Sequence, residues 1–95
     1  MPLENFLSFL QQLLAMVDPK NKASVELAKI SLRTVISLAE TSQKVGMATL
    51  RLMHLAEAQF DFLVMHREDY IGVPGEYSEN HMKRKRLEHV LTPGC

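Results

Sequence analysis

The chain has 95 residues and no net charge, because 11 Lys and Arg balance 11 Asp and Glu, and 46% of its residues are hydrophobic. This length fits one domain and excludes a two-domain enzyme with a separate cofactor module. A single cysteine excludes an intrachain disulfide framework, and the balanced charge removes the broad positive field of a general nucleic-acid or acidic-membrane binder.

The first predicted helix covers residues 3–17, where apolar side chains recur at helical spacing and polar residues such as Gln11 and Gln12 lie on the other side. Asp18-Pro19 ends this helix, because the residue before a proline is disfavoured in the helical conformation. The segment lacks the basic start of a signal peptide. No apolar run reaches the roughly 18 residues of a membrane span. We therefore expect a cytoplasmic protein without a membrane span.

The second helical region runs from 23 to 69 and consists mainly of good helix formers. An unbroken helix of this length would reach about 70 Å, whereas a compact chain of this size has a radius of gyration of about 13 Å. The region is therefore either one long helix paired with another chain or a hairpin that breaks near Gly46. Because the apolar periodicity keeps its phase through Gly46, we favour the continuous helix and keep the hairpin as the alternative.

One stripe of this region repeats in alternating steps of four and three residues, a spacing typical of helices that pack along a shared seam. Its centre is small around Gly46, where two helices could cross closely about a two-fold axis, and its ends carry larger apolar side chains. The residues predicted to mediate self-association are Leu32, Val35, Ala39, Gly46, Met53, Phe60 and Leu63.

The neutral total conceals a strong charge asymmetry along the chain. Residues 19–53 carry six basic and two acidic groups, a net charge of +4, whereas residues 54–79 carry six acidic groups and one basic group, a net charge of −5. Antiparallel pairing places each positive half beside a negative half. The pattern fits both an antiparallel pair of chains and an intrachain hairpin.

The C-terminal part begins with a Gly- and Pro-containing loop at 72–78, which separates a helical oligomerisation region at 1–71 from a basic C-terminal helix and tail at 79–95. The third predicted helix covers 79–91. It contains four consecutive basic residues that could contact an anionic partner, although a solvated helix turn or a pairing with the acidic region is the favoured interpretation. These residues are Lys83, Arg84, Lys85 and Arg86.

The sequence contains no recognisable constellation for catalysis, cofactor binding or metal binding. The four histidines, at positions 54, 66, 81 and 89, lack the i, i+4 spacing of a helical metal site. Cys95 is terminal and has no neighbours that would activate its thiol. No glycine-rich phosphate loop is present.

These observations predict an all-α protein that forms an antiparallel helical bundle as a homodimer. The favoured function is a non-enzymatic protein–protein interaction module, such as an adaptor, inhibitor, chaperone or scaffold component, whose partners are a second copy and another protein. The alternative is a small dimeric nucleic-acid-binding or regulatory protein that uses the basic segment 83–86.

Overall fold

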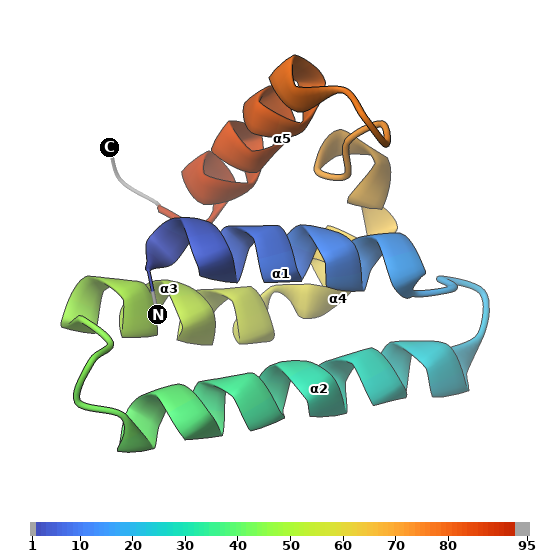
Figure 1. The fold of residues 1–95 in the computed structure, drawn as a ribbon. Coiled ribbons are helices and arrows are strands. Elements are labelled where there is room, and N and C mark those ends of the chain that lie inside the picture. Colours follow the sequence, from blue (N-terminus) through green and yellow to red (C-terminus); the bar gives the residue numbers. More distant parts are fainter. Residues whose placement is uncertain (1, 93–95) are drawn as a thin grey trace.

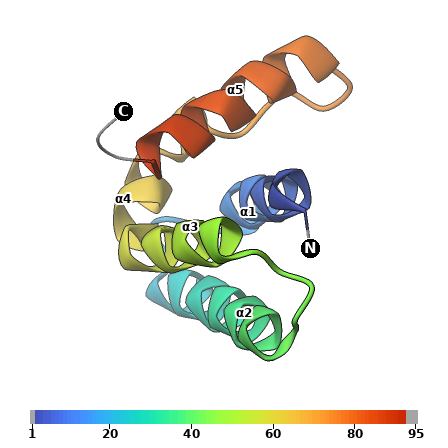
Figure 2. The ribbon, with the colours of Figure 1, turned by 90° about the vertical axis from the view of Figure 1, so that its left-hand side faces the viewer.

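The computed structural model describes residues 2–92 and shows five α-helices and one short 3₁₀ turn, with no strand in that part of the chain. The helices are α1 (Leu3–Met16), α2 (Lys22–Thr41), α3 (Met47–Ala58), α4 (Phe60–Met65) and α5 (Tyr77–Val90), and the 3₁₀ turn is Arg67–Asp69. Helices α1 and α3 lie in the middle of the molecule, with α2 on one side and α5 on the other (Figures 1 and 2). The predicted all-α class is confirmed.

Helix α1 is the first predicted helix and ends one residue earlier than expected. Pro2 occupies its N-cap, a position near the helix start where the missing proline N–H costs no hydrogen bond. At the other end, the Arg67 guanidinium donates to the carbonyl oxygens of Leu14 (2.8 Å) and Ala15 (2.9 Å). These carbonyls have no partner within the helix, so a side chain from a distant segment completes its C-terminus.

Helix α2 begins at a polar cap and ends where hydroxyl side chains compete for the backbone. The side chain of Asn21 accepts hydrogen bonds from the backbone N–H groups of Ala23 and Ser24. After Thr41 the chain becomes extended at Ser42, and the Lys44 N–H donates to the Ser42 hydroxyl at 3.2 Å. Such local side-chain bonds favour turns over helix continuation.

The prediction of one continuous helix over 23–69 is wrong, and the hairpin alternative describes the chain. Residues 42–46 turn the chain between α2 and α3, with Gly46 as the extended N-cap of α3. Val45 packs against the core and anchors this turn. A second interruption at Gln59 separates α3 from α4. These breaks let one chain reach a radius of gyration of 12.8 Å, the size of a compact monomer.

Helix α5 is attached to α1 through a buried amide and a few apolar side chains. The amide nitrogen of Gln11 donates to the backbone oxygens of Tyr70 (2.8 Å) and Asn80 (3.3 Å), and its oxygen accepts from the Arg84 guanidinium (3.2 Å). Leu87, on the inner side of α5, is fully buried in the core. The helix begins at Tyr77, two residues before the predicted start, and residues 1 and 93–95 of the predicted segments lie outside the described residues.

Candidate interaction surface

Six of the seven residues predicted to mediate self-association line or border the core of a single chain. Leu32, Met53, Phe60 and Leu63 are completely buried, Ala39 is 5% exposed, and Val35 packs partly buried against the same core. The expected seam is therefore the contact of α2 with α3 and α4. These side chains are already covered by their own chain, so a partner would have to contact other residues.

Gly46 has a different position from the one expected for it. It is exposed in the turn before α3, and no atom lies within 4 Å of a Cβ built on it. No close helix crossing occurs at this position, because the chain reverses here instead of continuing as a helix.

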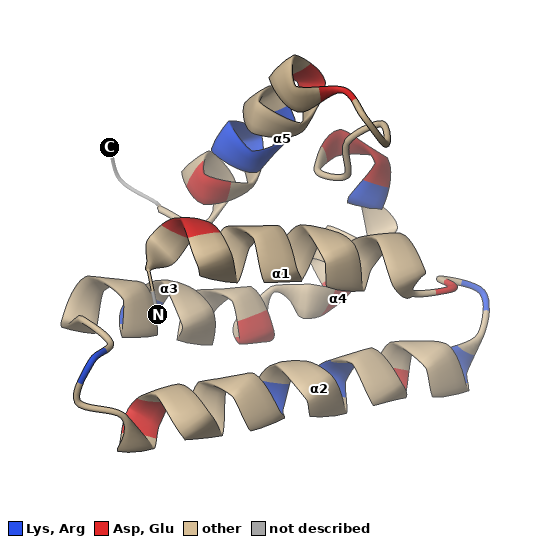
Figure 3. Cartoon of the chain, in the orientation of Figure 1, with Lys and Arg blue, Asp and Glu red and all other residues tan. Residues whose placement is uncertain are grey.

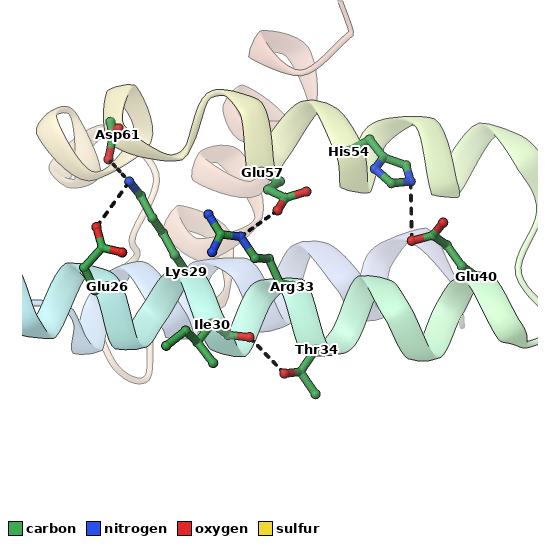
Figure 4. A network of polar contacts seen from close by, with 9 residues as sticks. All are labelled: Glu26, Lys29, Ile30, Arg33, Thr34, Glu40, His54, Glu57 and Asp61. Carbon is green, nitrogen blue, oxygen red and sulfur yellow. Dashed lines mark hydrogen bonds and ion pairs between the residues drawn. The ribbon is translucent and has the colours of Figure 1, made fainter.

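The predicted pairing of opposite charges occurs within the hairpin. Lys29 on α2 lies 2.9 Å from Asp61, and Arg33 lies 3.0 Å from Glu57 on α3 (Figure 4). The hydrogen bond that the Lys29 ammonium donates to the Asp61 carboxylate raises the pKa of Lys29. Each pair has one member that is well exposed to solvent, so the pairs contribute more to the alignment of the two helices than to stability.

All five charged residues of α2 lie along one edge of the helix. At about 100° of rotation per residue, they fall within an arc of about 60° around the helix axis. They are Lys22, Glu26, Lys29, Arg33 and Glu40. The outward face beside this edge carries no charge, and every residue on it is exposed. This uncharged outer face of α2 consists of Ala23, Leu27, Ile30, Ser31, Thr34, Ser37, Leu38 and Thr41. In Figure 4, Ile30 and Thr34 extend away from the charged side chains that pair with α3 and α4.

The polar groups on this face are largely satisfied by the helix itself. The hydroxyls of Ser31, Thr34 and Thr41 donate to the backbone oxygens of Leu27 (3.2 Å), Ile30 (2.9 Å) and Leu38 (2.9 Å). Covering the face with another protein would therefore leave these donors paired, which avoids the usual cost of burying a hydroxyl.

The same face groups three large exposed apolar side chains on one helix, whereas the others are spread over α1, α3, α4, α5 and the loop before α5. The exposed fractions are 65% for Leu27, 54% for Ile30 and 66% for Leu38. Single exposed leucines are common, but several along one uncharged helix face are typical of a contact surface. A hollow of about 420 Å³ lies along the face between Ile30 and Thr41. Another, of about 220 Å³, lies between α1 and α2 beside Met16 and Leu27.

The outer face of α2 was not among the predicted sites, although its signal is present in the sequence. Leu27, Ser31, Thr34, Leu38 and Thr41 follow the same alternating steps of four and three residues as the buried seam. Helix α2 thus has two such stripes, and only one of them is covered by its own chain.

The basic run on α5 divides into two pairs with different surroundings. Lys83 donates to the Glu68 carbonyl oxygen (3.1 Å) and lies 3.3 Å from Glu79, while Arg84 is held by Gln11. Lys85 and Arg86 are exposed, and they line an open hollow of about 700 Å³ together with His81, His89 and Tyr70. Figure 3 shows that α5 carries several charged residues, whereas α1 beside it carries a single acidic residue. Half of the predicted anionic-partner site therefore holds the fold together.

Residues 2–92 place no three His, Cys, Asp or Glu side chains in a metal-binding arrangement. None of the helices in this part of the chain combines the length and apolar character needed to cross a membrane. Comparison with known proteins finds no matching family model, no similar curated protein and no similar solved structure. The function must therefore be inferred from the surfaces themselves.

Proposed function

We propose that this protein is a non-enzymatic helical interaction module that binds other proteins by docking a helix on the uncharged outer face of α2. The observation that carries the proposal is the combination of exposed leucines with hydroxyls that are already paired to the helix backbone. The expected compartment remains the cytoplasm.

A helix is the partner element that best fits this face. Its stripe has the four-and-three spacing that lets a second helix pack along it, and a 20-residue helix offers a track about 30 Å long. The small side chains of Ser31 and Thr34 at the middle allow close approach, while Leu27 and Leu38 supply apolar anchors on either side. Recognition through spaced apolar anchors is a common way for proteins to bind helices.

The proposal is tested by thiol protection in living cells. Two single-cysteine variants are made in a Cys95→Ser background. Ser31→Cys places its thiol on the outer face of α2, and Glu76→Cys, the matched control, places its thiol in the exposed loop before α5. We expect a cell-permeant alkylating reagent to modify position 31 more slowly than position 76 in cells, because a bound partner excludes the reagent while it occupies the face. The two thiols should react at comparable rates in dilute purified protein. Equal rates in cells would refute docking at this face.

The nucleic-acid alternative depends mainly on Lys85 and Arg86, since the side chains of Lys83 and Arg84 are held by groups of other segments. Lys85 is exposed and lies 3.8 Å from Glu88 on its own helix. Two phosphate contacts give weak binding that depends modestly on salt. A titration with duplex and single-stranded nucleic acid at two salt concentrations, comparing the natural chain with a Lys85→Ala, Arg86→Ala variant, measures this contribution directly.

A further inference from the structure

We propose that the helix that docks on the outer face of α2 is α2 of a second copy, in antiparallel orientation. The inference rests on the proposed function, because it identifies the occupant of the same face. It replaces the buried seam expected from the sequence with a seam that is exposed on the folded monomer.

The register follows from the spacing of residues along the face. A two-fold axis that passes beside the middle of α2, between the levels of Ser31 and Thr34, places α2 of the second copy antiparallel to α2 of the first. Leu27 of one copy then lies at the level of Leu38 of the other, and Ser31 lies at the level of Thr34. The large side chains meet near both ends of the contact, and the small ones meet at its centre, where close approach is needed.

The two ends of the face are also complementary in shape. Leu38 is 66% exposed, whereas at the Leu27 level a hollow of about 220 Å³ opens between α1 and α2, with Met16 and Ser31 among its lining residues. The antiparallel arrangement brings the second copy's Leu38 beside this hollow. Symmetry repeats the contact at the other end, so one self-complementary patch serves both copies.

The charge distribution permits this pairing of like surfaces. A surface with one sign of charge repels its own copy, but the stripe from Leu27 to Thr41 has no charged residue on the outward face. The nearest cations at its edge, Lys29 and Arg33, are paired with carboxylates of α3 and α4 in the same chain. Between the levels of Leu27 and Leu38, the pairing of two such faces therefore places no unpaired like charges opposite each other.

The extent of the contact sets its strength. Two helices that touch over about 30 Å bury less than the roughly 800 Å² per partner of a standard interface, even with Met16 added at the edge. The expected complex is a reversible dimer with a Kd of about 10 µM or weaker.

Sedimentation equilibrium of the full chain from about 1 µM to about 1 mM, a range that spans weak association, tests the dimer. Leu38→Glu should raise the Kd of the dimer at least about tenfold, since it places a charge beside the apolar hollow between α1 and α2 of the second copy. Met65→Glu is the matched control, because Met65 is 77% exposed and belongs to α4, not to the outer face of α2. It should leave the Kd unchanged. Circular dichroism confirms that both variants fold.

The orientation is tested by cross-linking in the Cys95→Ser background. Ala23 and Thr41 are exposed near opposite ends of α2, about 27 Å apart along the helix. A short bis-maleimide should join a chain carrying Ala23→Cys to a chain carrying Thr41→Cys. It should not join two chains that carry the same substitution. Like-to-like products alone would refute the antiparallel register.

The outcomes separate this inference from the proposed function. A natural chain that stays monomeric over the whole concentration range refutes the second copy as the occupant, and protection of Ser31→Cys in cells would then assign the face to a different protein. A monomer whose Ser31→Cys is unprotected in cells refutes both proposals. A dimer that Leu38→Glu and Met65→Glu weaken equally places the contact elsewhere and also refutes the inference.

Discussion

Replacement of Gln11 by leucine is the sharpest test of how the C-terminal helix is held. The Gln11 side chain is 9% exposed, and its amide nitrogen donates to the Tyr70 carbonyl oxygen at 2.8 Å. Leucine has a similar volume and fills the same space, but it has no donor. The substitution therefore removes the hydrogen bonds while preserving most of the packing.

The expected loss can be worked out from the contacts. A buried carbonyl left without a donor costs about 1–3 kcal/mol. The contact with the Asn80 oxygen is longer and partly buried, and the Arg84 guanidinium is half-buried, so both can be hydrated and add little. The additional apolar burial of leucine offsets part of the cost. We expect a net loss of about 1–2 kcal/mol, which for a domain of this size corresponds to a fall in melting temperature of roughly 5–15 °C.

Urea and thermal denaturation of Gln11→Leu and Gln12→Leu provide the measurement. Gln12 is the exposed neighbour of Gln11 and makes no side-chain hydrogen bond among residues 2–92, so its replacement should change stability by less than about 0.5 kcal/mol. If the two variants are equally stable, the Gln11 amide does not hold α5.

Other predictions address backbone packing, helix capping and ionisation. Gly72→Ala should cost about 1–3 kcal/mol in denaturation experiments, because its Cβ would lie 2.8 Å from the Asn80 Cα and overlap its side chain. Gly46→Ala, with open space around it, should be nearly neutral in the same assay. Arg67→Met should cost about 1–2 kcal/mol by removing the C-terminal cap of α1. Burial, aided by a nearby acidic group, raises the pKa of Tyr70 above 10.0. Its contribution to stability is therefore complete below pH 10.0 and is lost as the pH rises above it, a loss that the phenylalanine variant should not show.

The sequence was sufficient to identify the buried side chains of the central region but not their partner. Leu32, Met53 and Phe60 were selected by periodicity, and all three are fully buried. Periodicity records which face of a helix is apolar and carries no information about whether the covering helix belongs to the same chain. The turn at 42–46 preserves the phase of the pattern, so a hairpin and a pair of long helices produce the same stripe.

The outer face of α2 was missed for a different physical reason. Ser31 and Thr34 are polar in any residue-by-residue assessment, so a stripe that contains them does not look apolar. Their hydroxyls become compatible with a buried contact only because each bonds to a backbone oxygen one turn earlier. The same limitation applies to Arg84, which belongs to a basic run in the sequence and to a buried amide network in the fold.

The contact between α1 and α5 has a consequence for how the molecule is made. Helix α2 and helix α3 are neighbours in sequence and can pair as soon as both have left the ribosome. Helix α1 emerges before α2 and α3, but its contact with α5 requires a helix that is made after both of them. The strongly apolar side of α1 thus remains incompletely covered while most of the chain is synthesised, a state prone to aggregation or to capture by chaperones. Complete protection of α1 therefore requires that α5 has been synthesised and has docked.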